Sequence, residues 1–179
     1  LVGHSVSGMV GVLAANREPK RFSHLIMIGP SPRYLNDGEG YTGGFEREDI
    51  DGMLGAMEQN YSGWAAFLAP QVMANPERPW LTFELEESFR ATDPVIARQF
   101  AQTLFYSDHR ADLAKVTVPS LVMQCADDVV APRSVGEYLR DNLPNAQLYR
   151  MNATGHYPHL SAPEETVSAI QSYLRTRAA

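Results

Sequence analysis

A serine, a pair of aspartates and a histidine are spaced along this 179-residue chain where a nucleophilic site could form. The serine lies in Gly3-His4-Ser5-Val6-Ser7-Gly8, which is close to the G-x-S-x-G pattern of a nucleophile elbow. In an elbow, a strained turn between a strand and a helix exposes the serine oxygen. Ser7 stands where the pattern has its second glycine, and it lacks a glycine two residues before it. Ser5 is therefore the predicted nucleophile, and an ordinary glycine-rich turn is the alternative interpretation.

A serine hydroxyl needs a base to remove its proton, so one of the five histidines must act with Ser5. His156 follows a predicted strand, 147–151, in a polar loop. Such loops gather at the carboxyl ends of parallel strands, where an elbow serine also lies. We predict His156 as the base. His159, three residues later, is the rival candidate and is expected to be a supporting loop residue. His24 and His109 are expected to be structural or exposed. His4, directly before Ser5, is expected to point away from that serine.

The base needs a carboxylate to orient it, and Asp127 and Asp128 both close the predicted strand 120–125. Position alone does not separate the two, and both could instead cap a solvated loop. The order serine, aspartate, histidine along the chain is nevertheless that of one large class of serine hydrolases and differs from the order in others.

The predicted chemistry is acyl transfer. Ser5 attacks a carbonyl, His156 accepts and returns the proton, and Asp128 holds the imidazole tautomer. The backbone N–H of Val6, at a helix N-terminus, donates to the oxyanion. The second donor of such a site comes from a loop after an earlier strand, which this sequence does not contain.

Strands and helices alternate at both ends of the chain. Residues 1–2, 24–28, 120–125 and 147–151 read as strands, with a turn at 3–5, and 6–16, 133–143 and 161–175 read as helices. We predict that the last helix begins with a capping box between Ser161 and Glu164. Its buried stripe is expected to be Val167, Ile170 and Leu174. The predicted class is α/β, a parallel sheet of about four strands covered on both faces.

The middle of the chain reads as helical. Apolar residues at 50, 53, 54, 57, 61 and 64 share one helical face, and Asp93-Pro94 is a helix start. Ile96, Phe100 and Leu104 follow at four-residue steps. We expect residues 33–111 to form a lid over a core of 1–32 and 112–179, with bends between helices at Pro70, Pro76 and Pro79. The many large apolar side chains suggest a pocket under that lid, although each could simply pack helices together.

Composition excludes several classes of function. A net charge of −6 argues against nucleic acid, which needs a basic face. No apolar run is long enough to cross a membrane, and no signal peptide is predicted. A single cysteine, Cys125, fits a reducing cytoplasmic compartment and is expected to be a buried strand residue. No metal-site spacing and no nucleotide-binding motif is present, so neither metal nor cofactor is predicted.

Several motifs together resemble the RsbQ-type α/β-hydrolases, bacterial relatives of the plant karrikin and strigolactone receptors. The likeness covers essentially the whole chain. The residues that carry it are Gly3–Met9, Ser31–Asp37, Gly43–Glu46, Asp93–Ala101, Ser107–Arg110 and Asp127–Pro132.

The resemblance implies a triad of Ser5, Asp128 and His156, and so favours the second aspartate. Ser7 in the elbow is typical of the family. A cap of four helices, as two hairpins in a V, is implied over a hydrophobic pocket. Phe45, Trp64 and Phe105 match pocket-lining positions, and Leu68 stands where the family has an aromatic residue.

Two functions follow from the resemblance. One is a serine hydrolase for a small hydrophobic ester or lactone. The other is a slowly hydrolysing receptor that activates a partner, which in RsbQ systems is a PAS-domain phosphatase in the stress pathway. We also expect about 80–100 residues upstream of Leu1, carrying the missing oxyanion donor, and expect this chain alone to be inactive.

Overall fold

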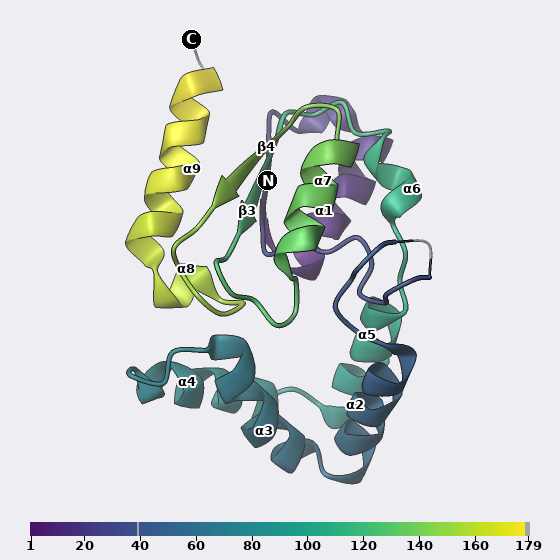
Figure 1. Cartoon of the computed structure of the whole chain (residues 1–179). Coiled ribbons are helices and arrows are strands. Elements are labelled where there is room, and N and C mark those ends of the chain that lie inside the picture. The colour runs from purple at the N-terminus through teal and green to yellow at the C-terminus, as the bar shows by residue number, and fades with distance from the viewer. Residues whose placement is uncertain (39, 178–179) are drawn as a thin grey trace.

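Four short parallel strands form the centre of the computed structural model (Figure 1), which describes residues 1–38 and 40–177. They lie side by side in the order β1-β2-β3-β4. Their register pairs Val2 with Ile26, and Ser120 with both Leu25 and Ala146. The strands are β1 (Val2–His4), β2 (Leu25–Ile28), β3 (Ser120–Gln124) and β4 (Ala146–Arg150). The predicted α/β class is confirmed.

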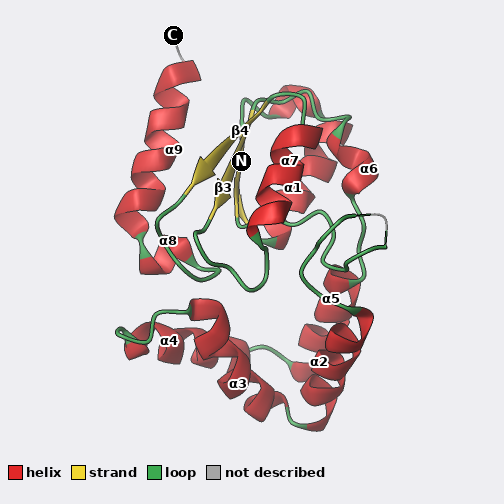
Figure 2. Ribbon diagram, in the orientation of Figure 1, coloured by secondary structure: helices red, strands yellow, loops and turns green. Residues whose placement is uncertain are grey.

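Helices cover both faces of this sheet, as Figure 2 shows. Successive side chains of a strand point to opposite faces. Leu25 and Met27 therefore pack beneath α1 (Val6–Arg17) and α7 (Arg133–Asn142), with the short elements η1 (Pro19–Arg21) and α6 (Arg110–Leu113) nearby. Ile26 and Ile28 face α9 (Pro163–Arg177), which follows the single turn α8 (Pro158–Ser161). The continuous apolar run of β2 makes that strand suitable for burial on both faces of the sheet.

Four helices form a separate layer beyond the carboxyl ends of the strands (Figure 1). They are α2 (Arg47–Gln59), α3 (Tyr61–Met73), α4 (Pro79–Arg90) and α5 (Pro94–Phe105). Helix α3 packs against α4 as a hairpin, whereas α2 packs against α5, the last helix of the layer. The predicted start of α5 is confirmed, because the Asp93 carboxylate caps the backbone N–H groups of Val95 and Ile96.

The apolar face predicted over residues 50–64 spans two helices rather than one. Helix α2 ends at Gln59, and α3 begins at Tyr61. Between them Asn60 leaves helical geometry, and its side chain accepts a hydrogen bond from Gly63 N at 2.9 Å. Asparagine is a strong N-cap, so this local bond ends one helix and starts the next. The apolar side chains still meet in one cluster around Ile50.

Pro70 lies inside α3, so the prediction that it marks a bend between helices is wrong. It removes one backbone hydrogen bond, yet the helix continues to Met73. The other two prolines do lie outside helix interiors. Pro76 falls in the turn before α4, and Pro79 is the first residue of that helix, where a missing N–H does no harm.

The predicted capping box of the last helix is absent. Ser161 is the final residue of α8, and its hydroxyl has no hydrogen-bond partner. The predicted buried stripe is also wrong in part, since Val167 and Leu174 are exposed. The side chains that pack on the sheet are Ala169, Ile170 and Tyr173, and Thr166 is buried as well.

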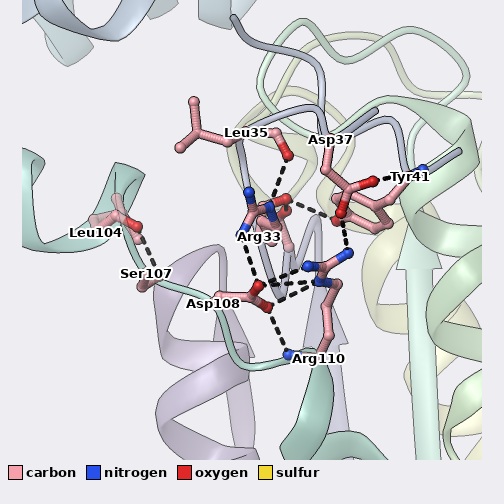
Figure 3. Close-up of polar contacts among 9 residues, drawn as sticks. Arg33, Leu35, Asp37, Tyr41, Leu104, Ser107, Asp108 and Arg110 are labelled. Carbon is pink, nitrogen blue, oxygen red and sulfur yellow. Dashed lines mark hydrogen bonds and ion pairs between the residues drawn. The ribbon is translucent and has the colours of Figure 1, made fainter. Parts of the chain in front are cut away.

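An ionic cluster ties together the two segments that connect the sheet with the helical layer (Figure 3). Arg33, on the outgoing segment, donates to Asp108, on the returning one, at 2.7 Å. Arg110 donates to Asp108 at 2.8 Å and also to Asp37. Partial burial would raise the pKa of Asp108, but the bonds from Arg110 and Arg33 lower it to about 2. We call these four residues the linker cluster.

Candidate active site

Ser5 lies in a strained turn between β1 and α1. Its φ of 54° and ψ of −124° are outside the regions that non-glycine residues favour. Two neighbours make the turn possible. A Cβ on Gly3 would lie 2.6 Å from the Ser7 carbonyl oxygen, and one on Gly8 would lie 3.0 Å from Pro30. The Ser5 N–H donates to Ile28 O at 2.8 Å, which fixes the turn to the neighbouring strand.

Three of the side chains predicted to act together lie in one hydrogen-bonded chain. Ser5 Oγ is 2.8 Å from His156 Nε2, and His156 Nδ1 is 2.8 Å from Asp128 Oδ2. Asp128 is 6% exposed and His156 3% exposed, so little water competes with either side chain for its hydrogen-bond partner. With the Nδ1–H tautomer, His156 donates to the carboxylate and accepts from the serine hydroxyl.

The two neighbouring aspartates have different environments. The Oδ1 atom of Asp128 accepts backbone N–H bonds from Val130 and Ala131, at 2.8 and 3.1 Å. This leaves Oδ2 for His156. Asp127 is exposed, and it is its backbone carbonyl that accepts from Gly155 N, at 2.7 Å. The structure therefore brings Asp128, and not Asp127, to the imidazole.

The loop that carries His156 is held by the helical layer. Gly155 has φ +80°, and a Cβ there would lie 2.1 Å from the Met73 carbonyl oxygen of α3. The His156 N–H donates to Val72 O at 2.7 Å. On the opposite side, a Cβ on Gly29 would lie 3.2 Å from the His156 ring. The imidazole is thus fixed from both the sheet and the layer of helices.

His4, which was predicted to point away from Ser5, lies against this loop. Its Nε2 is 2.6 Å from the His156 carbonyl oxygen, and because a carbonyl only accepts, Nε2 must carry the proton. Burial and the nearby His156 lower the pKa of His4 to about 3. Its ring also contacts His159, 4.5 Å between centroids, and burial lowers the pKa of His159 as well. No sequence signal marks this contact, which spans about 150 residues of chain.

A cavity of about 530 Å³ opens above Ser5, between the sheet and the helical layer. Ser5, Val6 and His156 are on its polar floor. The predicted pocket residues Trp64, Leu68 and Phe105 line it. Phe45 is not among the lining residues and packs instead against the Phe105 ring, 5.5 Å between centroids. Further lining residues are His4, Ser7, Met57, Tyr61, Val72, Phe89, Thr92, Ile96, Ala97, Phe100, Ala101, Leu104, Val130 and Tyr157.

The remaining large apolar residues of the helical layer have mixed positions. Phe89, Phe100 and Leu104 line the cavity, as the sequence suggested for the set. Phe67 and Phe83 instead point to solvent and are 70% and 64% exposed. Tyr157 and Val130 reach the cavity from loops after β4 and β3, which an apolar periodicity argument cannot find.

Val6 is the first residue of α1, directly after the serine. The first N–H groups of a helix have no acceptor within it, and the helix dipole makes them favourable to a negative charge. Since Val6 lines the cavity beside Ser5, its N–H can serve an oxyanion formed there.

Within the described residues there is no group of three or more His, Cys, Asp or Glu side chains that could hold a metal ion. Nor does any described helix combine the length and apolarity needed to span a membrane. Cys125 is buried directly after β3, and burial raises the pKa of its thiol to about 12, which makes it unreactive.

Comparison with known proteins gives consistent matches. A model of the alpha/beta hydrolase family matches residues 1–169. The strigolactone esterase RMS3 of Pisum sativum is 42% identical, over 90% of this chain and 61% of its own length. The karrikin insensitive 2 receptor IA of Petunia hybrida is 38% identical, over 97% of this chain and 63% of its own length.

A solved hydrolase from Oleispira antarctica has a TM-score of 0.93 and 38% identity, over 97% of this chain and 64% of that one. The chain therefore spans less than two thirds of the length of these relatives.

Proposed function

The chain belongs to the alpha/beta hydrolase family, and from this premise we propose that it is a serine hydrolase for small apolar esters or lactones. The observation that carries the proposal is the bonded series Ser5, His156, Asp128 at the floor of an apolar cavity. Nucleophile, base and orienting carboxylate are each within hydrogen-bond reach of the next, as covalent catalysis by serine requires.

In the proposed reaction, Ser5 Oγ attacks the carbonyl carbon while His156 Nε2 takes the hydroxyl proton. The Val6 N–H donates to the oxyanion of the tetrahedral intermediate. The intermediate collapses with loss of the alcohol, to which His156 returns the proton. Water then attacks the acyl-serine with His156 again as base, and the acid leaves. Throughout, Asp128 stabilises the imidazolium and holds its tautomer.

The walls of the cavity support a small, largely apolar substrate. Trp64, Phe89 and Phe105 supply aromatic surface, and polar groups gather at one end beside Ser5. A volume of about 530 Å³ is within the usual range for a small-molecule site. Leu68, in place of an aromatic residue, would widen the cavity relative to RsbQ-type proteins. The relatives named for strigolactone and karrikin support a small organic ligand.

We propose further that residues 33–111 act as the lid over a core of 1–32 and 112–179. We also propose that the protein is of the RsbQ type and cytoplasmic. The motif likeness supports the type, and the single buried cysteine is compatible with a reducing compartment.

The second candidate is a receptor that binds or slowly hydrolyses its ligand and activates a partner, such as a PAS-domain phosphatase. Two observations favour it. Relatives in Petunia are named as receptors. The α3–α4 hairpin also exposes large apolar side chains, which is typical of interaction surfaces: Phe67, Trp80 and Phe83.

Hydrolysis of p-nitrophenyl acetate by the complete gene product tests the first proposal. We expect turnover, and a loss of about 10⁴-fold or more in Ser5→Ala. Ser168→Ala, which changes an exposed serine of α9, is the matched control and should hydrolyse at the parental rate. Parental turnover in Ser5→Ala would refute the mechanism.

The receptor proposal needs a different readout. We expect Trp80→Ala to retain ester hydrolysis and to lose activation of the partner phosphatase. If activation survives this change together with Phe83→Ala, the exposed hairpin is not the partner surface.

A further inference from the structure

The side chain of His4 joins the two segments that carry the candidate nucleophile and the candidate base. His4 directly precedes Ser5, and its Nε2 lies 2.6 Å from the carbonyl oxygen of His156. The two bonded residues are 152 positions apart in the chain. This bond therefore ties the segment of Ser5 to that of His156, in addition to the bond between serine and imidazole.

The backbone of His4 is fixed by the sheet. His4 is the last residue of β1 and is in register with Ile28 of β2. The next N–H along the chain, that of Ser5, donates to Ile28 O at 2.8 Å. Since residues in register share a face of the sheet, the His4 side chain lies on the face of Ile28, toward α8 and α9. The strand thus brings this imidazole to the loop that carries His156.

The carbonyl of His156 is available to His4 because α8 uses a different acceptor. The N–H groups of Leu160 and Ser161 both donate to the Tyr157 carbonyl, at 3.0 Å. The His156 carbonyl belongs to a buried residue, and a buried backbone carbonyl needs a donor. His4 supplies that donor from a side chain.

The two backbone groups of His156 are thus held by different parts of the molecule. Its N–H donates to Val72 O of α3 at 2.7 Å, and its carbonyl accepts from His4 of β1 at 2.6 Å. One bond comes from the helical layer and the other from the sheet. The second is the one that ties this backbone to the strand of the nucleophile.

Three rings enclose the His4 imidazole. Its centroid lies 4.8 Å from that of His156, 4.9 Å from that of Tyr157 and 4.5 Å from that of His159. Burial and the nearby His156 lower the pKa of His4 to about 3, so at neutral pH the ring is uncharged and carries one proton. The bond to the carbonyl places that proton on Nε2. The donor is therefore in place before a substrate binds.

We propose that His4 is a positioning residue, whose Nε2–H bond to the His156 carbonyl holds the imidazole at the distance from Ser5 Oγ that proton transfer requires. The inference rests on the proposed function, because it assigns a further residue to the same reaction. In the resting state the distance between Ser5 Oγ and His156 Nε2 is 2.8 Å. His4 exchanges no proton and acts through the backbone of His156.

Loss of this bond should affect the chemical steps more than substrate binding. His156 moves a proton in both acylation and deacylation, so a displaced imidazole slows both. A misplacement of about 1 Å at a reacting group can cost about 10²-fold in rate. The apolar residues that would bind a substrate belong mainly to α3 and α5 and do not depend on His4. We therefore expect kcat to fall without a matching change in KM.

His4→Leu and His4→Met test the proposal, because both side chains fill a similar volume and neither has a donor. His4→Gln restores a donor, since its amide N–H extends about as far as Nε2. The rate of p-nitrophenyl acetate hydrolysis is measured in the complete gene product, per active site counted by fluorophosphonate titration. For the two donor-free variants we expect kcat to fall about tenfold to a hundredfold, and KM to stay within about twofold. His4→Gln should recover kcat to within about fivefold of the parent, because a hydrogen bond in altered geometry loses only part of its strength.

His24→Leu is the matched control. His24 is half-buried and precedes β2, at the amino ends of the strands and away from Ser5, so this variant should hydrolyse at the parental rate. If the donor-free variants keep the parental kcat, or if His4→Gln loses as much as they do, the inference is wrong and the proposed function stands. If the parental protein neither hydrolyses the ester nor labels at Ser5, the proposed function fails and the inference with it.

Discussion

The floor of the cavity, on the side of the sheet, and its roof, formed by α2 to α5, are held in place by different kinds of interaction. On the floor, Ser5, His156 and Asp128 are each fixed by hydrogen bonds and by glycines that leave no room for a side chain. On the roof, side chains such as Leu68 and Phe100 are held by apolar contacts or partly exposed. Directional bonds tolerate little displacement, whereas apolar packing tolerates exchange of similar volumes. The floor thus specifies chemistry, and the roof specifies what fits.

The two regions are nevertheless connected at one place. The His156 N–H bonds to Val72 O of α3, and Gly155 lies against the Met73 carbonyl. A roof helix therefore positions the His156 imidazole on the floor. Changes at this junction should affect catalysis even though no reacting atom is touched.

The largest effect is expected on the floor, from Asp128→Asn. Without the carboxylate the imidazole loses its orienting acceptor, so kcat for an aryl ester should fall about 10⁴-fold. Asp127→Asn is the control, since that side chain is exposed and does not contact His156. Steady-state kinetics of the two variants distinguish them. Equal losses of kcat in the two variants would contradict the structure, in which only the Asp128 side chain bonds to His156.

The junction comes next. Gly155→Ala would put a methyl group 2.1 Å from the Met73 carbonyl oxygen at a φ of +80°. The loop must move, and we expect kcat to fall about a hundredfold with a lower melting temperature. Gly55→Ala, in α2 with open space around it, should instead be neutral or stabilising by about 0.5–1 kcal/mol. A fully active Gly155→Ala protein would show that the roof does not hold the base.

The free energy of unfolding at acidic pH should depend on the buried side chain of His4. Its pKa is about 3 in the folded protein and about 6.5 unfolded, so between these values the unfolded chain binds more protons. Stability should then decrease as pH falls from about 6.5 toward 3, by up to about 1.4 kcal/mol per pH unit.

The ionisable side chains around His4 are His156, His159, Asp128 and Tyr157. Chemical denaturation of His4→Gln across this range should show a shallower decline than the parent. Identical slopes in the two proteins would contradict the assignment.

The smallest effect is expected on the roof. Leu68→Phe narrows the cavity but touches no polar group, so we expect a change in KM of about threefold to tenfold and a nearly constant kcat. The direction should depend on the acyl chain, with long esters losing more than acetate. A large loss in kcat for the acetate ester would contradict the prediction that the roof affects substrate binding and not the chemical step.

Sequence reasoning found the floor more readily than the roof, for a physical reason. The elbow serine and the residues after β3 and β4 follow from strand ends, which a parallel sheet brings to one edge. Choosing Asp128 over Asp127 needed the family resemblance, because only the turn at Val130 and Ala131 shows which carboxylate faces inward.

Features that depend on long-range contacts could not be predicted. His4 meets the loop of His156 across the fold, with its Nε2 2.6 Å from the His156 carbonyl oxygen. Asn60 divides a continuous apolar face because its cap is stronger than the helical periodicity. At Ser161 the opposite occurred, and a plausible capping pattern was overridden by the turn of α8. At Asn60 and Ser161 two local signals compete, and the residue pattern alone does not rank them.

The central claim is that Ser5 is the nucleophile. It is tested most directly by treating the complete gene product with a fluorophosphonate and locating the adduct by fragmentation mass spectrometry. We predict a single adduct on Ser5, absent in Ser5→Ala and strongly slowed in Asp128→Asn. An adduct on Ser7 or elsewhere, or no adduct in the parental protein, would contradict the claim.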